Sequence, residues 1–173
     1  MTARLTWTAA VLVGLSVAGS ALAQAPPTTA RPSAPASPPA TLVPGDVVQP
    51  FDAVGLDGVS RHIDFPKGSS TVVLFFLSSC PVCHKMLPVW SDYYQRKPAT
   101  VNVVAVMLDS PPPGFLAAMP IAFPVLRSPG QALHRAFKVN HVPMTIRVGP
   151  GGKVEEVGEG VLDPIKMGQI FRP

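Results

Sequence analysis

The chain has 173 residues, and its 14 basic and 10 acidic side chains give a formal net charge of +4. These charges are spread along the sequence without runs of one sign, which gives no case for a nucleic-acid partner. Two cysteines are too few for a disulfide scaffold, and the chain is long enough to bury a hydrophobic core.

Residues 1–23 are predicted to be a secretory signal peptide. Arg4 supplies a positive charge, residues 9–18 form a short apolar stretch, and the A-L-A sequence at 21–23 places cleavage before Gln24. The alternative is an uncleaved membrane anchor, but the apolar stretch is shorter than the roughly 20 residues that a spanning helix needs. We therefore expect a periplasmic or secreted protein in an oxidising compartment, where the two cysteines indicate one redox pair.

Residues 24–41 are rich in proline and alanine, as in the A-P-A-S-P-P sequence at 34–39. Such a segment cannot bury enough apolar surface to offset its ordering entropy, so it is predicted to be a disordered, extended linker. It either tethers the domain that follows or has no role of its own, and composition does not separate the two. The remaining residues, 42–173, have the size of a single domain.

The domain is predicted to begin with a β-hairpin over residues 47–63, because two strand-like segments flank a G-L-D-G turn. The apolar, β-branched and aromatic residues at 71–77 predict a central strand buried on both faces. A helix is expected over 81–96, with apolar side chains at helical spacing and a kink at Pro88. A second buried strand is predicted at 101–108.

The second half of the domain is predicted to contain shorter elements. Three consecutive prolines require a loop over 109–114. After that loop we expect a helical turn at 115–119, a short strand at 123–126, a helix at 130–137, a hairpin of strands 144–148 and 154–158, and a helix through Ile170. Ser128 and Asp163 are predicted to cap the last two helices. Parallel strands joined by helices, with an antiparallel hairpin at the end, predict an α/β sandwich with a mixed sheet.

Cys80 and Cys83 form a C-x-x-C motif where the central strand meets the helix. A disulfide that closes so small a loop constrains the unfolded chain very little, so the motif indicates redox chemistry rather than a structural bridge. Cys80 is expected at the helix N-cap with Pro81 in the first helical position, where free N–H groups and the helix dipole favour a thiolate. Cys80 is therefore the predicted nucleophile, and Cys83 the thiol that resolves the mixed disulfide.

Two histidines and a proline are further candidates. His84 could tune the cysteine pair, but neighbouring helix residues do not face each other, so a polar residue on the exposed helix face is the favoured interpretation. His141 belongs to an H-V-P-M sequence that leads into the final hairpin. Pro143 in this sequence is a candidate cis proline, where the chain swings back toward the cysteines.

The sequence resembles the thioredoxin fold, and more closely the secreted thioredoxin-like proteins of the TlpA/ResA type. The matching features are the hairpin at 45–58, the strand and motif at 72–83, Pro88 five residues after the second cysteine, and V-P-M-T at 142–145 before a G-P-G-G-K turn. The string at 80–88 also resembles MauD-type thioredoxin-like proteins of methylamine utilisation. The resemblance implies a thioredoxin-like three-layer sandwich over residues 42–173, with a mixed central sheet and an N-terminal β-hairpin extension.

The resemblance also implies a role for each matching residue. Cys80 would be the nucleophile and Cys83 the resolving thiol of a redox-active disulfide. Pro143 would be the cis proline beside this disulfide, and its neighbour Val142 would offer backbone groups to a bound client peptide.

The chain departs from the family close to the motif. Ser79 replaces the tryptophan that usually precedes the motif, and Leu74 replaces the buried acid that thioredoxins carry six residues before the first cysteine. The glutamate found inside some ResA-type motifs is also absent, so Cys83 lacks the usual carboxylate as its proton acceptor. Asp109 is the nearest substitute, although a loop-capping role is the preferred interpretation.

The predicted function is that of a periplasmic thiol–disulfide oxidoreductase, acting as a reductant in the maturation of cytochrome c or a metalloenzyme. The expected partners are a client protein with a dithiol or disulfide and an upstream thiol–disulfide electron donor. A membrane-embedded protein is one candidate for this donor. No cofactor and no nucleic acid are expected. The alternative is a Cu(I)-binding metallochaperone that uses Cys80, Cys83 and His141 as ligands, although copper carriers of this fold usually space their cysteines by three residues.

Overall fold

The structure is a computed structural model that describes residues 41–173. In this part of the chain, strands form one mixed sheet in the order β2-β1-β5-β4-β3-β6-β7. The strands are β1 (Phe51–Gly55), β2 (Ser60–Ile63), β3 (Ser70–Phe76), β4 (Val101–Met107), β5 (Val125–Arg127), β6 (Met144–Val148) and β7 (Val154–Glu159). The helices are α1 (Pro81–Arg96), α2 (Phe115–Ala118), α3 (Gln131–Ala136) and α4 (Pro164–Phe171), and a 3-10 turn, η1 (Pro150–Gly152), joins β6 to β7.

Strand β3 lies in the interior of the sheet, between β4 and β6. All of its residues are buried, which explains why its sequence is continuously apolar instead of alternating as in a half-exposed strand. It pairs parallel with β4 and antiparallel with β6. The predicted central strand and mixed sheet are therefore confirmed.

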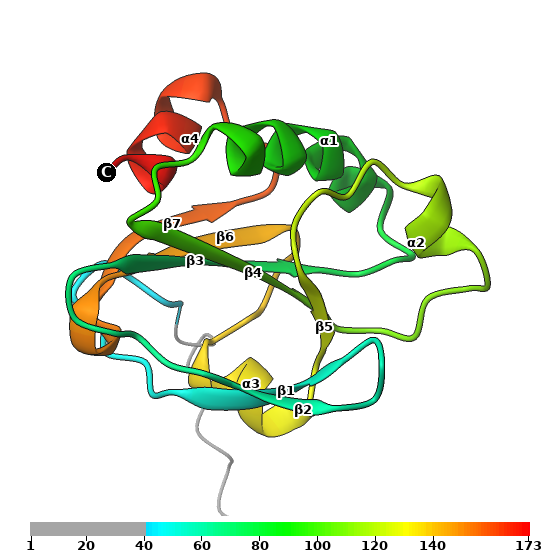
Figure 1. Cartoon of the computed structure of the whole chain (residues 1–173), viewed down its shortest axis with the longest axis horizontal. Coiled ribbons are helices and arrows are strands. Elements are labelled where there is room, and N and C mark those ends of the chain that lie inside the picture. Colours follow the sequence, from blue (N-terminus) through cyan, green and yellow to red (C-terminus); the bar gives the residue numbers. More distant parts are fainter. Residues whose placement is uncertain (1–40) are drawn as a thin grey trace, which may run out of the picture. The chain divides into compact units, whose positions relative to one another are not determined.

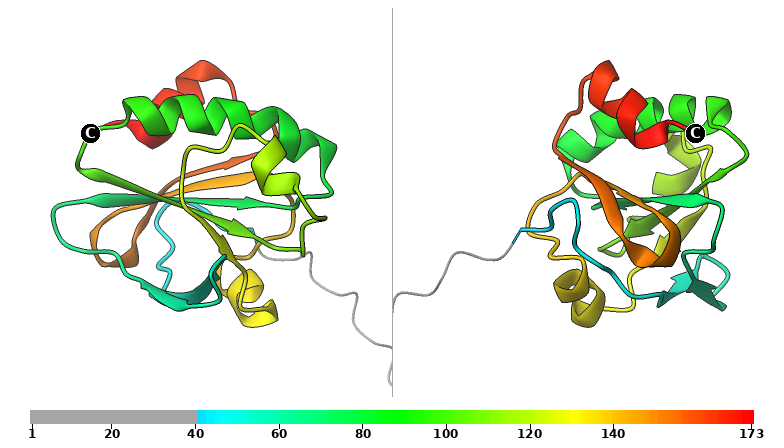
Figure 2. Two further views of the ribbon diagram at one scale, coloured as in Figure 1. Left: turned by 45° about the vertical axis from the view of Figure 1, so that its right-hand side comes forward. Right: turned by 90° about the vertical axis from the view of Figure 1, so that its left-hand side faces the viewer.

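Side chains of β3 alternate between two hydrophobic layers. Leu74 and Phe76 pack with residues of α1 and α4, whereas Val73 and Phe75 pack with residues of α3. Figures 1 and 2 show α1 and α4 on one side of the central strands and α3 on the other, while the β1–β2 hairpin continues the sheet beyond β5. The described domain thus has the three layers and the N-terminal hairpin that were expected.

Helix α1 starts just beyond the carboxyl end of β3 and packs along the sheet. Pro81 occupies its first turn and Pro88 lies inside it. Trp90 is fully buried, and its Nε1 donates a hydrogen bond to Oγ1 of Thr145 on β6 over 3.1 Å. Helix α1 is therefore held to the sheet by a specific hydrogen bond as well as by apolar burial.

Two predicted details in the first and third quarters of the domain are wrong. Strand β1 begins at Phe51 rather than residue 47, because Val47 contributes only an isolated bridge to the sheet. Helix α3 has Gly130 rather than Ser128 as its N-cap. The Ser128 hydroxyl accepts a hydrogen bond from the Gly130 N–H over 3.2 Å, so it forms a turn before the helix instead of capping it.

The other predicted elements of the second half are present. Strand β5 covers Val125–Arg127 rather than 123–126, because Pro124 has no N–H for the ladder. The side chain of Asp163 caps α4 as predicted, by accepting from the N–H of Lys166 over 2.8 Å.

The predicted signal peptide (1–23) and nearly all of the predicted linker (24–41) lie outside the described residues. Within residues 41–173, no helix combines the length and the apolar character needed to cross a bilayer. The longest helix in this range is α1, with 16 residues.

Candidate active site

The two cysteines lie at the start of α1, as predicted. Cys80 is the N-cap residue, with its side chain half-buried, and Cys83 is fully buried in the first turn. Both thiols are free, and Sγ of Cys80 accepts a hydrogen bond from the Cys83 N–H over 3.2 Å. An N–H directed at this sulfur stabilises negative charge on it, so the local geometry suits a thiolate nucleophile at Cys80.

The environment of Cys83 disfavours its ionised form. Burial raises the pKa of the Cys83 thiol to about 12, and the hydrogen bond with Cys80 and the negative charges of Cys80 and Asp109 act in the same direction. A backbone hydrogen bond involving Leu77 opposes the increase without cancelling it. Cys83 therefore stays a thiol at neutral pH, behind the more accessible Cys80.

Val142 and Pro143 flank the motif on the side of β6. The peptide bond between them is cis, which is the geometry that the resemblance implied. The carbonyl oxygen of Val142 lies 4.0 Å from Sγ of Cys80. The carbonyl oxygen of Pro143 accepts from the Gly160 N–H over 2.8 Å, so the 160 loop supports this turn. The structure thus brings Cys80, Val142 and Pro143 together.

Asp109 flanks the motif on the opposite side, just after β4. Its Oδ1 accepts from the Ser78 N–H over 2.7 Å, and its Oδ2 accepts from the Ser78 hydroxyl at 2.9 Å. The N–H and hydroxyl of Ser79 also donate to Oδ2, both over 3.1 Å. Burial opposes ionisation of this carboxyl, but the bonds from Ser78 and Ser79 outweigh it and lower the pKa of Asp109. The preferred loop-capping interpretation is confirmed, and a carboxylate held in this way is a poor proton acceptor for Cys83.

His84 is half-buried, so the prediction that it sits on the exposed helix face is wrong. Its Nε2 lies 2.7 Å from the carbonyl oxygen of Ser78, and its ring packs against Phe115 of α2 with centroids 5.4 Å apart. The ring turns back toward the strand–helix junction because α2 closes over this side of α1. Its side-chain contacts are with Ser78, before the motif, and with Phe115 of α2.

His141 lies away from any arrangement that could hold copper. Its side chain is 77% exposed, and its Nδ1 is 4.0 Å from Oε2 of Glu159. Across residues 41–173, no three His, Cys, Asp or Glu side chains are grouped so that they could bind a metal ion. The structure therefore does not assemble the predicted copper ligands Cys80, Cys83 and His141 into one site.

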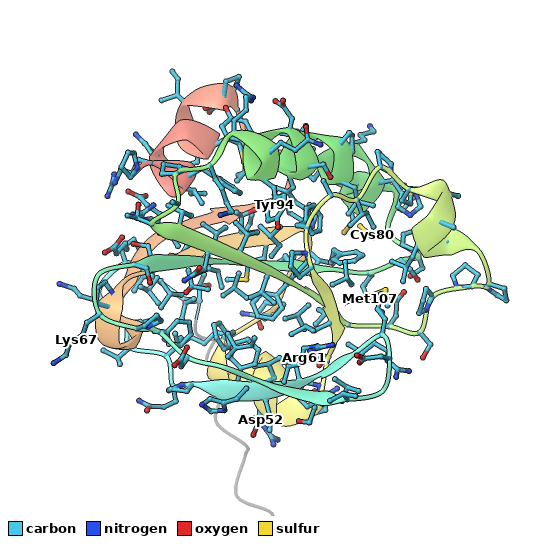
Figure 3. The ribbon with its side chains drawn as sticks, in the orientation of Figure 1. Asp52, Arg61, Lys67, Cys80, Tyr94 and Met107 are labelled. Carbon is cyan, nitrogen blue, oxygen red and sulfur yellow. The ribbon has the colours of Figure 1, made fainter. Side chains whose placement is uncertain are left out.

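An open cleft lies beside Asp109, on the side of the motif opposite Pro143. Its volume is about 450 Å³, and its lining residues are Val54, Met107, Leu108, Asp109, Ser110, Arg127 and Ser128. Figure 3 labels Cys80 and Met107 in this part of the molecule, near the carboxyl ends of β3 and β4. Carboxyl ends of parallel strands are a common location for binding sites, and this cleft lies at that edge of the sheet.

The contacts between Asp109, Ser78, Ser79 and His84 were not predicted. A signal for part of this network was present, because Asp109 follows β4 and two serines follow β3. Parallel neighbours end at the same edge of a sheet, so these polar residues had to meet. The contact of His84 depends on the side-chain direction and on α2, and spacing along the sequence does not reveal it.

A sheet of this topology, with a cysteine pair at the helix after the central strand and a cis proline opposite, defines the thioredoxin-fold class. The model of the AhpC/TSA family matches residues 44–157, and the chain belongs to that family.

Individual relatives agree with this assignment. The thiol-disulfide oxidoreductase ResA of Oceanobacillus iheyensis is 27% identical over 100 residues, which are 56% of this chain and 52% of the relative. The sporulation thiol-disulfide oxidoreductase A of Bacillus subtilis is 26% identical over 101 residues, 54% of this chain and 61% of the relative. The chain thus spans between half and two thirds of the length of these curated relatives.

Among solved structures, StoA from Bacillus subtilis superposes with a TM-score of 0.62 at 22% identity, over 73% of this chain and 98% of StoA. This likeness shows the thioredoxin-like fold. The resemblance to ResA-type proteins inferred from the sequence is confirmed.

Proposed function

We propose that this protein is a periplasmic thiol–disulfide oxidoreductase that reduces disulfides in client proteins. The observation that carries the proposal is the unequal pair: Cys80 is accessible at the helix N-cap, and Cys83 is buried directly behind it. The backbone N–H of Cys83 donates to Sγ of Cys80, which favours attack by Cys80. The names of the two curated relatives support the same activity.

In the proposed reaction, the Cys80 thiolate attacks one sulfur of a client disulfide and forms a mixed disulfide. The other client sulfur leaves as a thiolate and takes up a proton. Cys83 then gives up its proton, and its sulfur attacks Sγ of Cys80, so that the bond from Cys80 to the client breaks. The client has gained two electrons and two protons, and the protein now holds the Cys80–Cys83 disulfide. An upstream dithiol donor must then return two electrons and two protons to the protein.

The reducing direction is supported by the resemblance to the TlpA/ResA and MauD types, because the electrostatics of the two thiols differ. A C-x-x-C protein is a strong oxidant when its reduced form is stabilised as a thiolate. Here the Cys83 N–H favours a thiolate at Cys80, whereas burial and neighbouring negative charge raise the pKa of Cys83 to about 12, so only Cys80 can stabilise the reduced form in this way at neutral pH. The resemblance to the TlpA/ResA and MauD types therefore carries the choice of a reductant in cytochrome c or metalloenzyme maturation.

Export and domain organisation belong to the same proposal. Residues 1–23 would be removed as a signal peptide, residues 24–41 would form the linker, and residues 42–173 would be the catalytic domain. The protein would then work outside the cytoplasm, where client disulfides form. Sequencing the N-terminus of the exported protein tests this part: it should begin at Gln24, and retention of residue 1 would contradict it.

Trapping of mixed disulfides tests the activity. Replacing Cys83 by Ser leaves Cys80 able to attack but removes the thiol that resolves the adduct, so client adducts should accumulate in the cell envelope. Electrophoresis without reductant followed by mass spectrometry identifies them. The double variant Cys80→Ser/Cys83→Ser is the control, because it keeps the fold and lacks the nucleophile. Adducts that are absent, or equally abundant in the control, would overturn the proposal.

A further inference from the structure

We propose that Asp109 and His84 are positioning residues that hold Ser78 from two sides and thereby fix the place of Cys80. The inference deepens the proposed oxidoreductase function and rests on it. Ser78 lies two residues before Cys80, in the segment that connects β3 to α1. We refer to Asp109, Ser78 and His84 as the junction clamp.

Asp109 forms the first half of the junction clamp. Its carboxylate accepts four hydrogen bonds, two from Ser78 and two from Ser79, with lengths from 2.7 to 3.1 Å. All four donors lie in the two residues directly before the motif. A carboxylate with this many donors stays ionised and leaves no N–H or hydroxyl of this segment unpaired.

His84 forms the second half, from the first turn of α1. The carbonyl oxygen of Ser78 can only accept a hydrogen bond, so the His84 Nε2 at 2.7 Å must carry the hydrogen. In the neutral ring, Nδ1 is then the nitrogen without a proton. Contact with the Phe115 ring holds the imidazole in this orientation.

The two halves together occupy every polar group of Ser78. Its N–H and hydroxyl donate to Asp109 and its carbonyl accepts from His84, while the residue is only 4% exposed. The Cys80 N–H donates to the carbonyl of Leu77 over 3.3 Å, which closes the turn. The path from β3 to Cys80 is thus fixed on both sides, and displacement of a reacting atom by about 1 Å can cost on the order of 100-fold in rate.

Asp109 also acts on the pair through its charge. Its negative charge is one of the causes that raise the pKa of Cys83. Removing this charge should shift the alkylation profile of Cys83 toward lower pH, and the profiles are compared in folded proteins because unfolding would also relieve the burial that raises this pKa. The other titratable groups around the clamp are Cys80, His84 and, across the neighbouring cleft, Arg127.

The test compares matched variants in the turnover of a synthetic peptide disulfide, with dithiothreitol as the electron donor. Asp109→Asn keeps the shape but places an amide against N–H and hydroxyl donors. His84→Phe keeps the ring against Phe115 but removes the donor, whereas His84→Gln can still donate to Ser78. Asp92→Asn is the control, because Asp92 is an exposed carboxylate of α1 whose side chain pairs with Arg96.

We expect Asp109→Asn and His84→Phe each to lower kcat by at least about tenfold, with KM changed by less than about threefold. His84→Gln should recover most of the loss, and Asp92→Asn should behave as wild type. The alkylation profile of Cys83 should move to lower pH in Asp109→Asn alone.

The inference would be overturned if folded Asp109→Asn had the kcat of wild type. It would also be overturned if His84→Gln and His84→Phe lost the same fraction of kcat. If Asp109→Asn does not fold, the two His84 variants decide the matter. Failure of the oxidoreductase function itself is distinguishable, because wild type would then show no turnover that depends on Cys80.

Discussion

Two charged side chains each organise a polar network in this domain, at opposite ends of its central strands. Arg147 on β6 is 4% exposed, and its guanidinium bonds to Oε2 of Glu155, to Oγ of Ser70 and to backbone carbonyls. Those carbonyls belong to Ile170, Arg172 and Pro173, at the end of α4. Asp109 is half-buried and bonds to the segment before the cysteines. Each charge gathers partners that are distant in sequence.

The difference between the networks lies in what they hold. Arg147 fastens α4 to the sheet, and no reactive group lies among its partners. Asp109 fastens the junction from which Cys80 projects, and its charge reaches Cys83. Loss of Arg147 should therefore lower the free energy of unfolding with little effect on turnover. Loss of Asp109 should lower turnover with little effect on the free energy of unfolding. A buried polar network is evidence for a structural or a catalytic role only when its partners are known.

The largest expected effect on stability is that of Arg147→Met. It leaves Glu155, Ser70 and several carbonyls without their donor, so the free energy of unfolding should fall by about 3 kcal/mol. The kcat of the folded variant should stay within about twofold of wild type, because no partner of Arg147 touches the motif. Urea denaturation and peptide-disulfide turnover measure the two quantities.

The matched control for that change is Arg61→Met. Arg61 pairs with Asp57 on the surface, with both side chains about half exposed, so its loss should cost no more than about 0.5 kcal/mol. Equal costs for the two arginine variants would remove the distinction between the buried network and a surface ion pair.

A smaller effect is expected in alkaline solution. The pKa of Cys83 is raised from 9.0 to about 12 in the folded protein, so between these values the folded state binds more protons than the unfolded state. Stability from this group is complete below pH 9 and is lost as pH rises toward 12. In Cys83→Ala this part of the decline should disappear. Denaturation of both proteins at several pH values measures it, and parallel curves would contradict the assignment.

A modest effect on stability, between those of the two arginine variants, is expected of Asp109→Asn. The pKa of Asp109 is lowered below its usual 3.8 by the bonds from Ser78 and Ser79, so its contribution is complete above that pH and is lost as pH falls below it. Allowing for partial exposure, the variant should lose about 1 kcal/mol at neutral pH. The difference from wild type should shrink in acid. A loss as large as that of Arg147→Met would make the Asp109 network mainly structural.

The sequence was sufficient for the parts of the fold that depend on local patterns. The apolar run of β3, the N-cap position of Cys80 and the Asp163 cap of α4 were predicted correctly, because each rests on residues adjacent in the chain. The Ser128 cap failed for a related reason: a serine before a proline can form either a turn or a cap, and here the turn prevails.

The junction clamp could not be predicted in full because it depends on contacts between distant segments. Asp109 and Ser78 are 31 residues apart and meet because β3 and β4 end at the same edge of the sheet. His84 was assigned to the exposed helix face from its position next to Cys83. Its actual direction is set by α2 and Phe115, which helix periodicity does not contain.

The central claim is that Cys80 is the attacking thiol and Cys83 the resolving thiol. Competitive alkylation of the reduced wild-type protein tests it most directly. At pH 7, limiting iodoacetamide followed by mass spectrometry of the peptides gives the rate at each thiol. Cys80 should react at least about tenfold faster than Cys83, because Cys83 is fully buried and remains protonated. Equal rates, or faster modification of Cys83, would contradict the assignment of Cys80 as the attacking thiol.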